Sequence, residues 1–224
     1  MRKKLVVFGN TNYAEMVCDY FTDYSDYDVV AFTVDSAYVS SDQFYGRPLV
    51  DFTDIEKVYS PNDYDMFVAV GSAQLNHLRE RICNQAKAKG YHLATFVHPN
   101  AYVARDVSIG ENCILMECSR VLTRTKICDN VIIWPTGFVS HNCIVGNNCY
   151  IVGSVNGFVD VGDNCFLGAG AMIADGVHIA KDNFIAMGAV VRKDTEQDSL
   201  YDGYPATKHP RITASMFAKL NKKY

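Results

Sequence analysis

The segment Ser140-His141-Asn142-Cys143 carries the side chain best suited to proton transfer. An imidazole outside a hydrophobic core titrates near neutral pH and can act as a general base. His141 follows the aliphatic Val139 by two residues, so we expect its ring to lie outside the core. A glycine beside a distorted corner can direct its N–H at a developing oxyanion, and Gly157 lies in a glycine-containing stretch further along the chain.

A second candidate site is the loop 9–14, Gly-Asn-Thr-Asn-Tyr-Ala, between an apolar run and an amphipathic stretch. Such a loop presents backbone N–H groups and a helix N-terminus to an anionic ligand. It lacks the later glycines of a dinucleotide fingerprint, which disfavours a nicotinamide enzyme. A mononucleotide is compatible with it, and Asp35, Gly71 and Ser72 are expected at the same crevice. An ordinary turn without a ligand is the alternative.

A six-residue repeat indicates the element that positions His141. Neither a helix nor an ordinary strand keeps every sixth side chain inward, whereas a triangular parallel β-helix does. Between Ile151 and Val161 the spacing is ten residues, which predicts an irregularity near Gly153–Gly157. The repeated aliphatic residues are Val97, Val103, Ile109, Leu115, Val121, Ile127, Ile133, Val139, Val145 and Ile151, followed by Val161, Leu167, Ile173, Ile179, Ile185 and Val191.

Residues 1–96 show a different pattern, in which apolar runs alternate with amphipathic stretches. This βαβαβ order predicts a small α/β domain with a parallel, Rossmann-like sheet. We therefore expect three parts: an α/β domain over 1–96, a left-handed parallel β-helix over 97–200, and a C-terminal loop with a short helix over 201–224. The apolar and amphipathic segments are 4–8, 13–24, 29–34, 66–70, 73–89 and 92–97, with a short strand after Gly46 and a helix near 54–58.

Composition limits the partners and the compartment. The net charge of -4 and the lack of a basic cluster disfavour a nucleic-acid partner. No apolar segment is long enough for a membrane span or a signal peptide, so we expect a cytoplasmic protein. Five of the eight cysteines lie inside the repeat without a CxxC pair and are expected to be small buried side chains rather than disulfides: Cys113, Cys128, Cys143, Cys149 and Cys165.

Several motifs together resemble the bacterial nucleotide-sugar acetyltransferases of the left-handed β-helix superfamily. This group includes sialic-acid O-acetyltransferases and UDP-4-amino-sugar N-acetyltransferases. The resemblance covers nearly the whole chain. Its motifs are the loop Gly9-Asn10-Thr11-Asn12, the junction Val97-His98-Pro99, the corner Ser140-His141-Asn142-Cys143-Ile144-Val145-Gly146, the run Leu167-Gly168-Ala169-Gly170-Ala171, and Gly203-Tyr204-Pro205-Ala206.

The resemblance implies a homotrimer in which acetyl-CoA lies between adjacent β-helices and the N-terminal domain holds the nucleotide sugar. His141 would then be the general base, with Asn142 beside it, and Gly157 would offer its N–H to the thioester oxygen; no metal is implied. The cofactor-facing positions would be Tyr150, Gly157, Ala169 and Met187. The nucleotide would contact Thr11, Asn12, Tyr13, Asp35, Gly71 and Ser72.

Three positions depart from the family pattern. Asn142 stands where an acidic residue commonly follows the base, and Tyr13 and Tyr150 stand where histidines are common. A neutral Asn142 can orient the imidazole but cannot stabilise an imidazolium as a carboxylate does. We expect N-acylation of an amino sugar; alternatives are O-acetylation of a sugar hydroxyl and a non-catalytic nucleotide-binding scaffold. A metal-dependent carbonic anhydrase would need three converging histidines, and only His141 and His178 lie within the repeat proper.

Overall fold

The computed structural model describes residues 2–204 and 206–220. The chain divides into two compact units, residues 1–71 with 81–96, and residues 72–80 with 97–224. The α/β domain expected over 1–96 differs from the first unit, because residues 72–80 belong with the second unit. Pro205 of the Gly-Tyr-Pro-Ala motif, and residues 221–224, lie outside the described residues.

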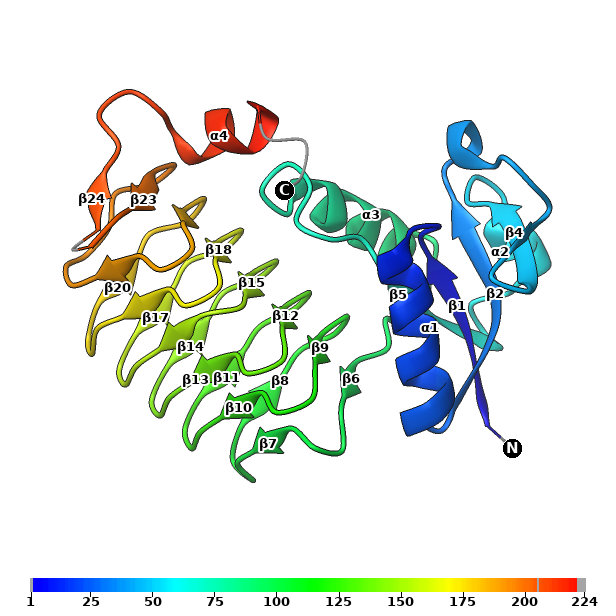
Figure 1. Cartoon of the computed structure of the whole chain (residues 1–224). Coiled ribbons are helices and arrows are strands. Elements are labelled where there is room, and N and C mark those ends of the chain that lie inside the picture. Colours follow the sequence, from blue (N-terminus) through cyan, green and yellow to red (C-terminus); the bar gives the residue numbers. More distant parts are fainter. Residues whose placement is uncertain (1, 205, 221–224) are drawn as a thin grey trace. The chain divides into compact units, whose positions relative to one another are not determined.

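The first unit is a mainly parallel sheet with the strand order β3-β4-β2-β1-β5 (Figure 1). The last four residues of β1 are all buried, so this strand is covered on both faces, as expected for a parallel sheet covered by helices. Beyond β5, Leu93 adds only one parallel bridge to Met66, so the strand expected over 92–97 is reduced to that bridge and to β6 (Phe96–Val97). The strands are β1 (Lys3–Phe8), β2 (Tyr27–Val34), β3 (Gln43–Phe44), β4 (Arg47–Asp51) and β5 (Tyr64–Val68), and the helices are α1 (Asn12–Tyr24), η1 (Ser36–Tyr38), α2 (Ile55–Val58) and the later turns of α3 (His77–Ala88).

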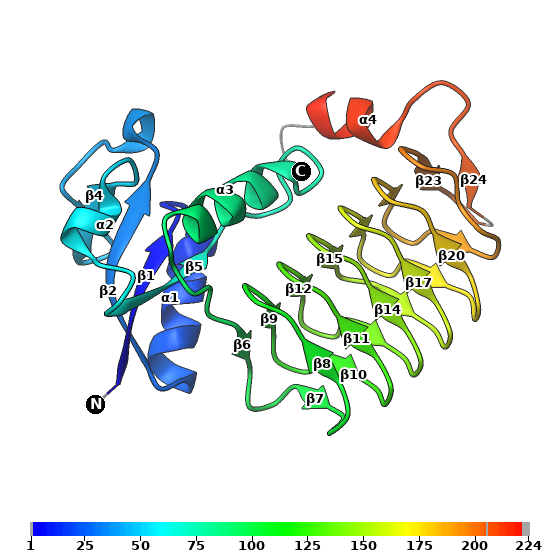
Figure 2. The ribbon, with the colours of Figure 1, turned by 180° about the vertical axis from the view of Figure 1, so that it is seen from behind.

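The second unit is a three-sided parallel β-helix, whose short strands stack coil upon coil in Figures 1 and 2. The first sheet holds β7 (Tyr102–Val103), β10 (Arg120–Val121), β13 (Phe138–Val139), β16 (Ser154–Val155), β19 (Met172–Ile173) and β22 (Val190–Val191). The second sheet holds β8 (Ser108–Ile109), β11 (Lys126–Ile127), β14 (Ile144–Val145), β17 (Asp160–Val161) and β20 (His178–Ile179). The third sheet holds β6, β9 (Ile114–Leu115), β12 (Ile132–Ile133), β15 (Tyr150–Ile151), β18 (Phe166–Leu167), β21 (Phe184–Ile185), β23 (Leu200–Asp202) and β24 (Thr207–Lys208).

The corners between these sheets form three edges. The histidine edge joins the first and second sheets and contains residues 104–107, 122–125, 140–143, 156–159 and 174–177. The asparagine edge joins the second and third sheets and contains 110–113, 128–131, 146–149, 162–165 and 180–183. The third edge returns to the first sheet through 116–119, 134–137, 152–153, 168–171 and 186–189.

The repeated aliphatic side chains form the core of the β-helix from Leu115 to Val191, as predicted. At its beginning Val97 is 38% exposed, because the first coil has no earlier coil to cover it. Val155 also points inward and restores the six-residue period before Val161. Four of the five cysteines expected to be buried in the repeat are buried, Cys128 is half-buried, and all eight in the chain are free thiols.

The phase slip arises from one shortened corner on the third edge. Strand partners on successive coils are normally 18 residues apart, as for Arg120 and Phe138, but Phe138 pairs with Ser154, 16 residues on. Only Val152 and Gly153 connect β15 to β16, and a Cβ on Gly153 would lie 2.4 Å from the Ala171 carbonyl oxygen. The irregularity is therefore at Gly153, within the stretch Gly153–Gly157 where it was predicted.

Most corners of the β-helix have a residue with left-handed backbone at a fixed position, three residues after the inward aliphatic. Asparagine tolerates this conformation better than most residues, which explains its frequency there. Asn142 is one of these residues, with φ 58°. The others include Asn112, Cys118, Arg124, Asn130, Thr136, Asn148, Phe158, Asn164, Gly170, Gly176, Asp182 and Gly188.

On the asparagine edge these residues form a buried ladder. Asn112 donates to Asn130 at 2.8 Å, and the same bond continues from Asn130 to Asn148 and from Asn148 to Asn164: 2.8 and 2.7 Å. Arg79, from the first turn of α3, is fully buried against the ladder. Its guanidinium donates to the side chain of Asn130 and to the carbonyl oxygens of Asn130, Asn148 and Cys149. The sequence patterns did not indicate this anchor.

The third sheet carries an outward row of aromatic rings. Tyr150 stacks on Phe166 at a centroid distance of 5.0 Å, and Phe166 stacks on Phe184 at 4.5 Å. The short C-terminal helix expected near 212–220 is α4 (Ala214–Leu220), which packs on this row through Ala214 and Ala218. In the described part of the chain, no helix combines the length and apolarity that a membrane crossing requires.

Candidate active site

His141 lies on the histidine edge, at the corner between β13 and β14. Its side chain is half-buried and outside the aliphatic core, as the repeat phase predicts. The imidazole meets the ring of Phe158 edge-on at a centroid distance of 5.0 Å. Phe158 belongs to the next coil and is itself 61% exposed, so this edge of the β-helix presents an imidazole and a phenyl ring to the outside.

Asn142 holds the imidazole in one orientation. Its Oδ1 lies 3.1 Å from His141 Nδ1 and also accepts a hydrogen bond from Arg124 Nε at 3.2 Å. Guanidinium nitrogens only donate, so the Asn142 atom that faces both groups is the oxygen. Nδ1 of His141 therefore carries the proton, and Nε2 keeps the lone pair that a general base needs.

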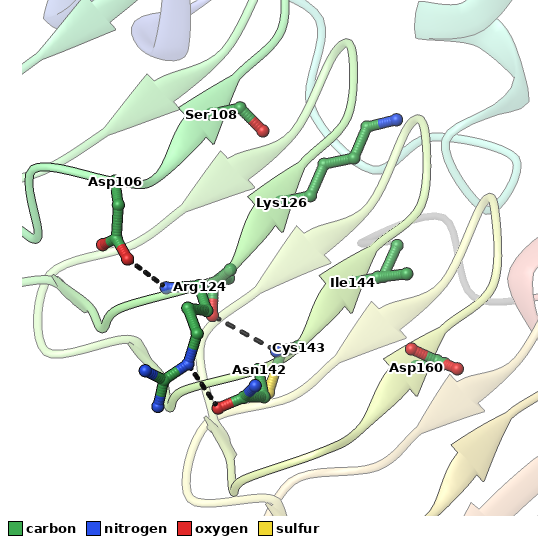
Figure 3. A pocket seen from close by; sticks show the side chains of 9 residues that line it. Asp106, Ser108, Arg124, Lys126, Asn142, Cys143, Ile144 and Asp160 are labelled. Atoms are coloured by element: carbon green, nitrogen blue, oxygen red, sulfur yellow. Dashed lines mark hydrogen bonds between the residues drawn. The ribbon is translucent and has the colours of Figure 1, made fainter.

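Arg124 was not among the residues expected to act, because nothing in its local sequence separates it from a solvated cation. Its backbone is left-handed, with φ 56°, at the position of Asn142 one coil earlier. The backbone N–H of Arg124 donates to Asp106 Oδ2 at 3.1 Å (Figure 3). Thr123 Oγ1 donates to the same oxygen at 2.6 Å. These hydrogen bonds, that of Thr123 first, lower the pKa of Asp106.

A shallow pocket of 380 Å³ lies beside this corner on the outer side of the second sheet (Figure 3). Two cations, Arg124 and Lys126, and two carboxylates, Asp106 and Asp160, line this pocket, so it offers ion pairing and hydrogen bonding. Its lining residues are Asp106, Ser108, Arg124, Thr125, Lys126, Asn142, Cys143, Ile144 and Asp160.

Gly157 lies next to His141, but its N–H is not open to an oxyanion. The Gly157 N–H donates to Asp175 Oδ1 at 2.9 Å. A Cβ added to Gly157 would be 2.8 Å from His141 Cε1 and 3.0 Å from Nε2. The predicted proximity of His141 and Gly157 is present, whereas the predicted role of its N–H conflicts with the hydrogen bond to Asp175.

Of the positions expected to line CoA, only Gly157 shares an edge with His141 in one chain; Tyr150, Ala169 and Met187 do not. Ala169 and Met187 lie on the third edge, and the Met187 side chain is 75% exposed. Tyr150 belongs to the stacked ring row of the third sheet, so the structure does not bring it to the His141 corner. Burial is the main cause that raises the pKa of Tyr150 to about 12, and this phenol stays protonated at neutral pH.

Several residues expected to contact the nucleotide lie at the carboxyl ends of β1 and β2 in the first unit. Gly9 has φ 139°, and a Cβ there would lie 2.8 Å from the Ala69 carbonyl oxygen, so this turn requires glycine. Thr11 is the N-cap of α1, and Thr11 and Asn12 are exposed, while Tyr13 is half-buried. A helix N-terminus with exposed polar residues at a parallel sheet edge is suited to an anion.

Asp35 has a cationic partner that the sequence patterns did not reveal. Its Oδ2 lies 3.6 Å from Arg81, which α3 contributes to the first unit. Gly71 ends the first stretch of the same unit and has room for a Cβ. Ser72, expected beside these residues, belongs to the second unit instead.

His178 is exposed on β20, as its repeat context indicates. It pairs across the second sheet with Asp160 and lies on a strand rather than at the corner of His141. Among the described residues, no three His, Cys, Asp or Glu side chains are grouped closely enough to hold a metal ion.

Two family descriptions match the chain. Residues 4–86 match the PglD N-terminal domain, and residues 158–193 match the bacterial transferase hexapeptide repeat (six repeats). Two curated proteins show partial similarity. GDP-perosamine N-acetyltransferase of Escherichia coli O157:H7 is 29% identical over 45% of this chain and 46% of its own, and gamma carbonic anhydrase 1, mitochondrial, of Arabidopsis thaliana is 33% identical over 57% and 52%. The chain thus spans about half the length of the curated relatives it matches.

A solved structure resembles the chain over nearly its full length. PerB from Caulobacter crescentus, crystallised with CoA and GDP-perosamine, superposes with a TM-score of 0.81 and 26% identity, covering 93% of this chain and 98% of PerB. The predicted order of a Rossmann-like domain, a parallel β-helix and a short C-terminal helix is confirmed.

Proposed function

Because the chain belongs to the left-handed β-helix acyltransferases, we propose that it transfers an acyl group from acyl-CoA to the amino group of a nucleotide-linked sugar. Acetyl is the simplest acyl group. The observation that carries the proposal is the half-buried His141, whose Nδ1 is fixed on Asn142 so that Nε2 is available as a base. The solved relative PerB was crystallised with CoA and GDP-perosamine, which supports this pair of substrate classes.

The geometry supports direct transfer. The sugar amine attacks the thioester carbonyl carbon, and His141 Nε2 takes the proton that the nitrogen loses. The C–S bond then breaks, and the CoA sulfur leaves with the electron pair and receives the proton from the imidazolium. An amine is a better nucleophile than a hydroxyl, and a base oriented by a neutral amide suits it better. O-acetylation remains the second candidate.

We further propose that the working enzyme is a trimer. The expected CoA positions Ala169 and Met187 lie on the third edge, while His141 lies on the histidine edge. A complete site would combine the histidine edge of one subunit with the third edge of its neighbour. The first unit would hold the nucleotide through the N-terminus of α1 and Asp35. A cytoplasmic location stays a prediction.

CoA release tests the function. Purified protein is incubated with acetyl-CoA, a thiol reagent, and nucleotide-linked 4-amino and 3-amino sugars, with hydroxyl analogues in parallel. His141→Gln should reduce kcat by about 100-fold or more, as expected for loss of a general base. His178→Gln, at an exposed histidine on the same β-helix, is the matched control and should keep wild-type turnover.

The alternatives predict other results in the same experiment. Full activity of His141→Gln would reject His141 as the base. Nucleotide binding without CoA release in the presence of any acceptor would support a non-catalytic scaffold. The partial similarity to a gamma carbonic anhydrase makes a metal analysis worthwhile, and stoichiometric bound metal with CO2 hydration would favour that reaction.

A further inference from the structure

Asp175 lies on the histidine edge, at the corner position that His141 and Gly157 occupy in the two preceding coils. Its Oδ1 accepts the Gly157 N–H at 2.9 Å and would lie 3.2 Å from a Cβ on that glycine. From the other side, His141 Nε2 would lie 3.0 Å from the same Cβ. The imidazole and the carboxylate thus reach, from opposite sides, toward one space that exists because residue 157 has no side chain.

We propose that Asp175 is a positioning residue for His141 and that its carboxylate supplies the negative charge that Asn142 does not. Gly157 has no side chain, which leaves the space in which His141 and Asp175 approach each other. The proposal rests on the proposed acyl transfer, in which His141 Nε2 becomes positively charged when it takes the proton of the amine. An opposite charge within about 4–6 Å favours the charged form of such a group. The C–S bond cleavage and the return of the proton to sulfur are unchanged.

The other charges around His141 make this role more important. Arg124 reaches Asn142 Oδ1 and lies behind the Nδ1 side of the imidazole, where its positive charge opposes an imidazolium. Asp106 is engaged by Thr123 and by the backbone of Arg124. Phe158 covers another side of the imidazole with an uncharged ring. Asp175 is therefore the carboxylate that the described structure places toward Nε2.

Aspartates at other corners show which part of this arrangement is structural. On the asparagine edge, Asp129 accepts the Glu111 N–H at 3.0 Å and Asp163 accepts the Asn147 N–H at 2.6 Å. These carboxylates stabilise the backbone of the preceding coil, and no histidine reaches toward either glycine beside them. Asp175 makes the same type of backbone bond, so Asp163 is its matched control.

The test is the NMR titration of the His141 ring in the full chain, assigned by comparison with His141→Gln. Asp175→Asn should lower the titration midpoint of His141 by about one pH unit, the lower end expected for loss of a nearby opposite charge. Asp163→Asn should leave that midpoint unchanged, although both variants lose one negative charge while keeping an amide oxygen that can accept the backbone N–H. Asp175→Glu keeps the charge and should restore most of the midpoint.

Activity gives a second readout. The acidic limb of the kcat profile should move by the same pH interval in Asp175→Asn, and kcat should fall by up to about tenfold with little change in KM. An unmoved midpoint, or an equal movement in Asp163→Asn, would overturn the role of Asp175. A moved midpoint in a protein without acyl transfer would retain the pairing and reject the proposed function. If Asp175→Asn does not fold, the His141 midpoint of Asp175→Glu is measured at low salt and at 1 M salt. The same midpoint at both salt concentrations would reject an electrostatic role.

Discussion

The histidine edge and the asparagine edge are built from the same corner, yet they are used in opposite ways. On the asparagine edge, equivalent positions hold the same residue in four coils, and the side chains bond to one another in a buried ladder. On the histidine edge, the same left-handed position holds Arg124, Asn142, Phe158 and Gly176, and the position before it holds His141, Gly157 and Asp175, so the repetition is lost. Identical residues at a repeated position stabilise the stack, whereas different residues there bring unlike groups together.

Arg79 should produce the largest effect on the asparagine edge. Arg79→Met removes donors from the Asn130 side chain and from several buried carbonyl oxygens, so the free energy of unfolding should fall by about 3 kcal/mol or more. Urea denaturation measures this change in the free energy of unfolding. Arg81→Met, two residues later and half-exposed, should change stability by less than about 1 kcal/mol. Equal losses in both variants would contradict the anchor.

Substitution of one glycine on each edge allows a second comparison of the two edges. A Cβ on Gly157 would meet side-chain atoms of His141 and Asp175, whereas a Cβ on Gly146 would lie 2.8 Å from the backbone nitrogen of Asp163. Gly157→Ala should therefore fold and lose roughly 100-fold in kcat, because the imidazole is displaced. Gly146→Ala should instead lose about 1–3 kcal/mol of stability, because backbone has to move. Melting curves and CoA release distinguish the two, and the opposite pattern would remove the distinction between the edges.

Two asparagine-to-aspartate changes should have the smallest effects, and they should change the free energy of unfolding differently on the two edges. In Asn148→Asp the buried side chain loses its donor to Asn164, so two oxygens face each other and stability should fall by about 1–3 kcal/mol. In Asn142→Asp the oxygen that accepts from Arg124 and His141 becomes a carboxylate, and stability should stay within about 0.5 kcal/mol or rise. Both residues have left-handed backbone, which Asp tolerates, so the comparison isolates the side chain. Thermal melts of the two variants check it.

Much of the histidine edge could be predicted from residue spacing. The phase of Val139 placed His141 outside the core, and its neighbour Asn142 lies within hydrogen-bond distance because the corner turns there. Arg124 and Asp175 could not be predicted, since they reach this corner from the preceding coil and from two coils later. The prediction located the shortened corner only within Gly153–Gly157, because a spacing of ten residues does not reveal where two residues were lost and Val155 restores the six-residue period before Val161.

Residue spacing alone was sufficient to predict the β-helix, the α/β unit before it and the candidate base, because inward aliphatic side chains must recur with the period of the fold. Three contacts became visible only in the folded chain: the Gly157 N–H donates to Asp175, Tyr150 lies in a ring stack, and Arg79 is buried on an asparagine ladder. Each of these contacts joins residues that are 16 or more positions apart in the sequence. Periodicity indicates which side chains point inward, but the lateral stacking of coils selects the partners of those that point outward.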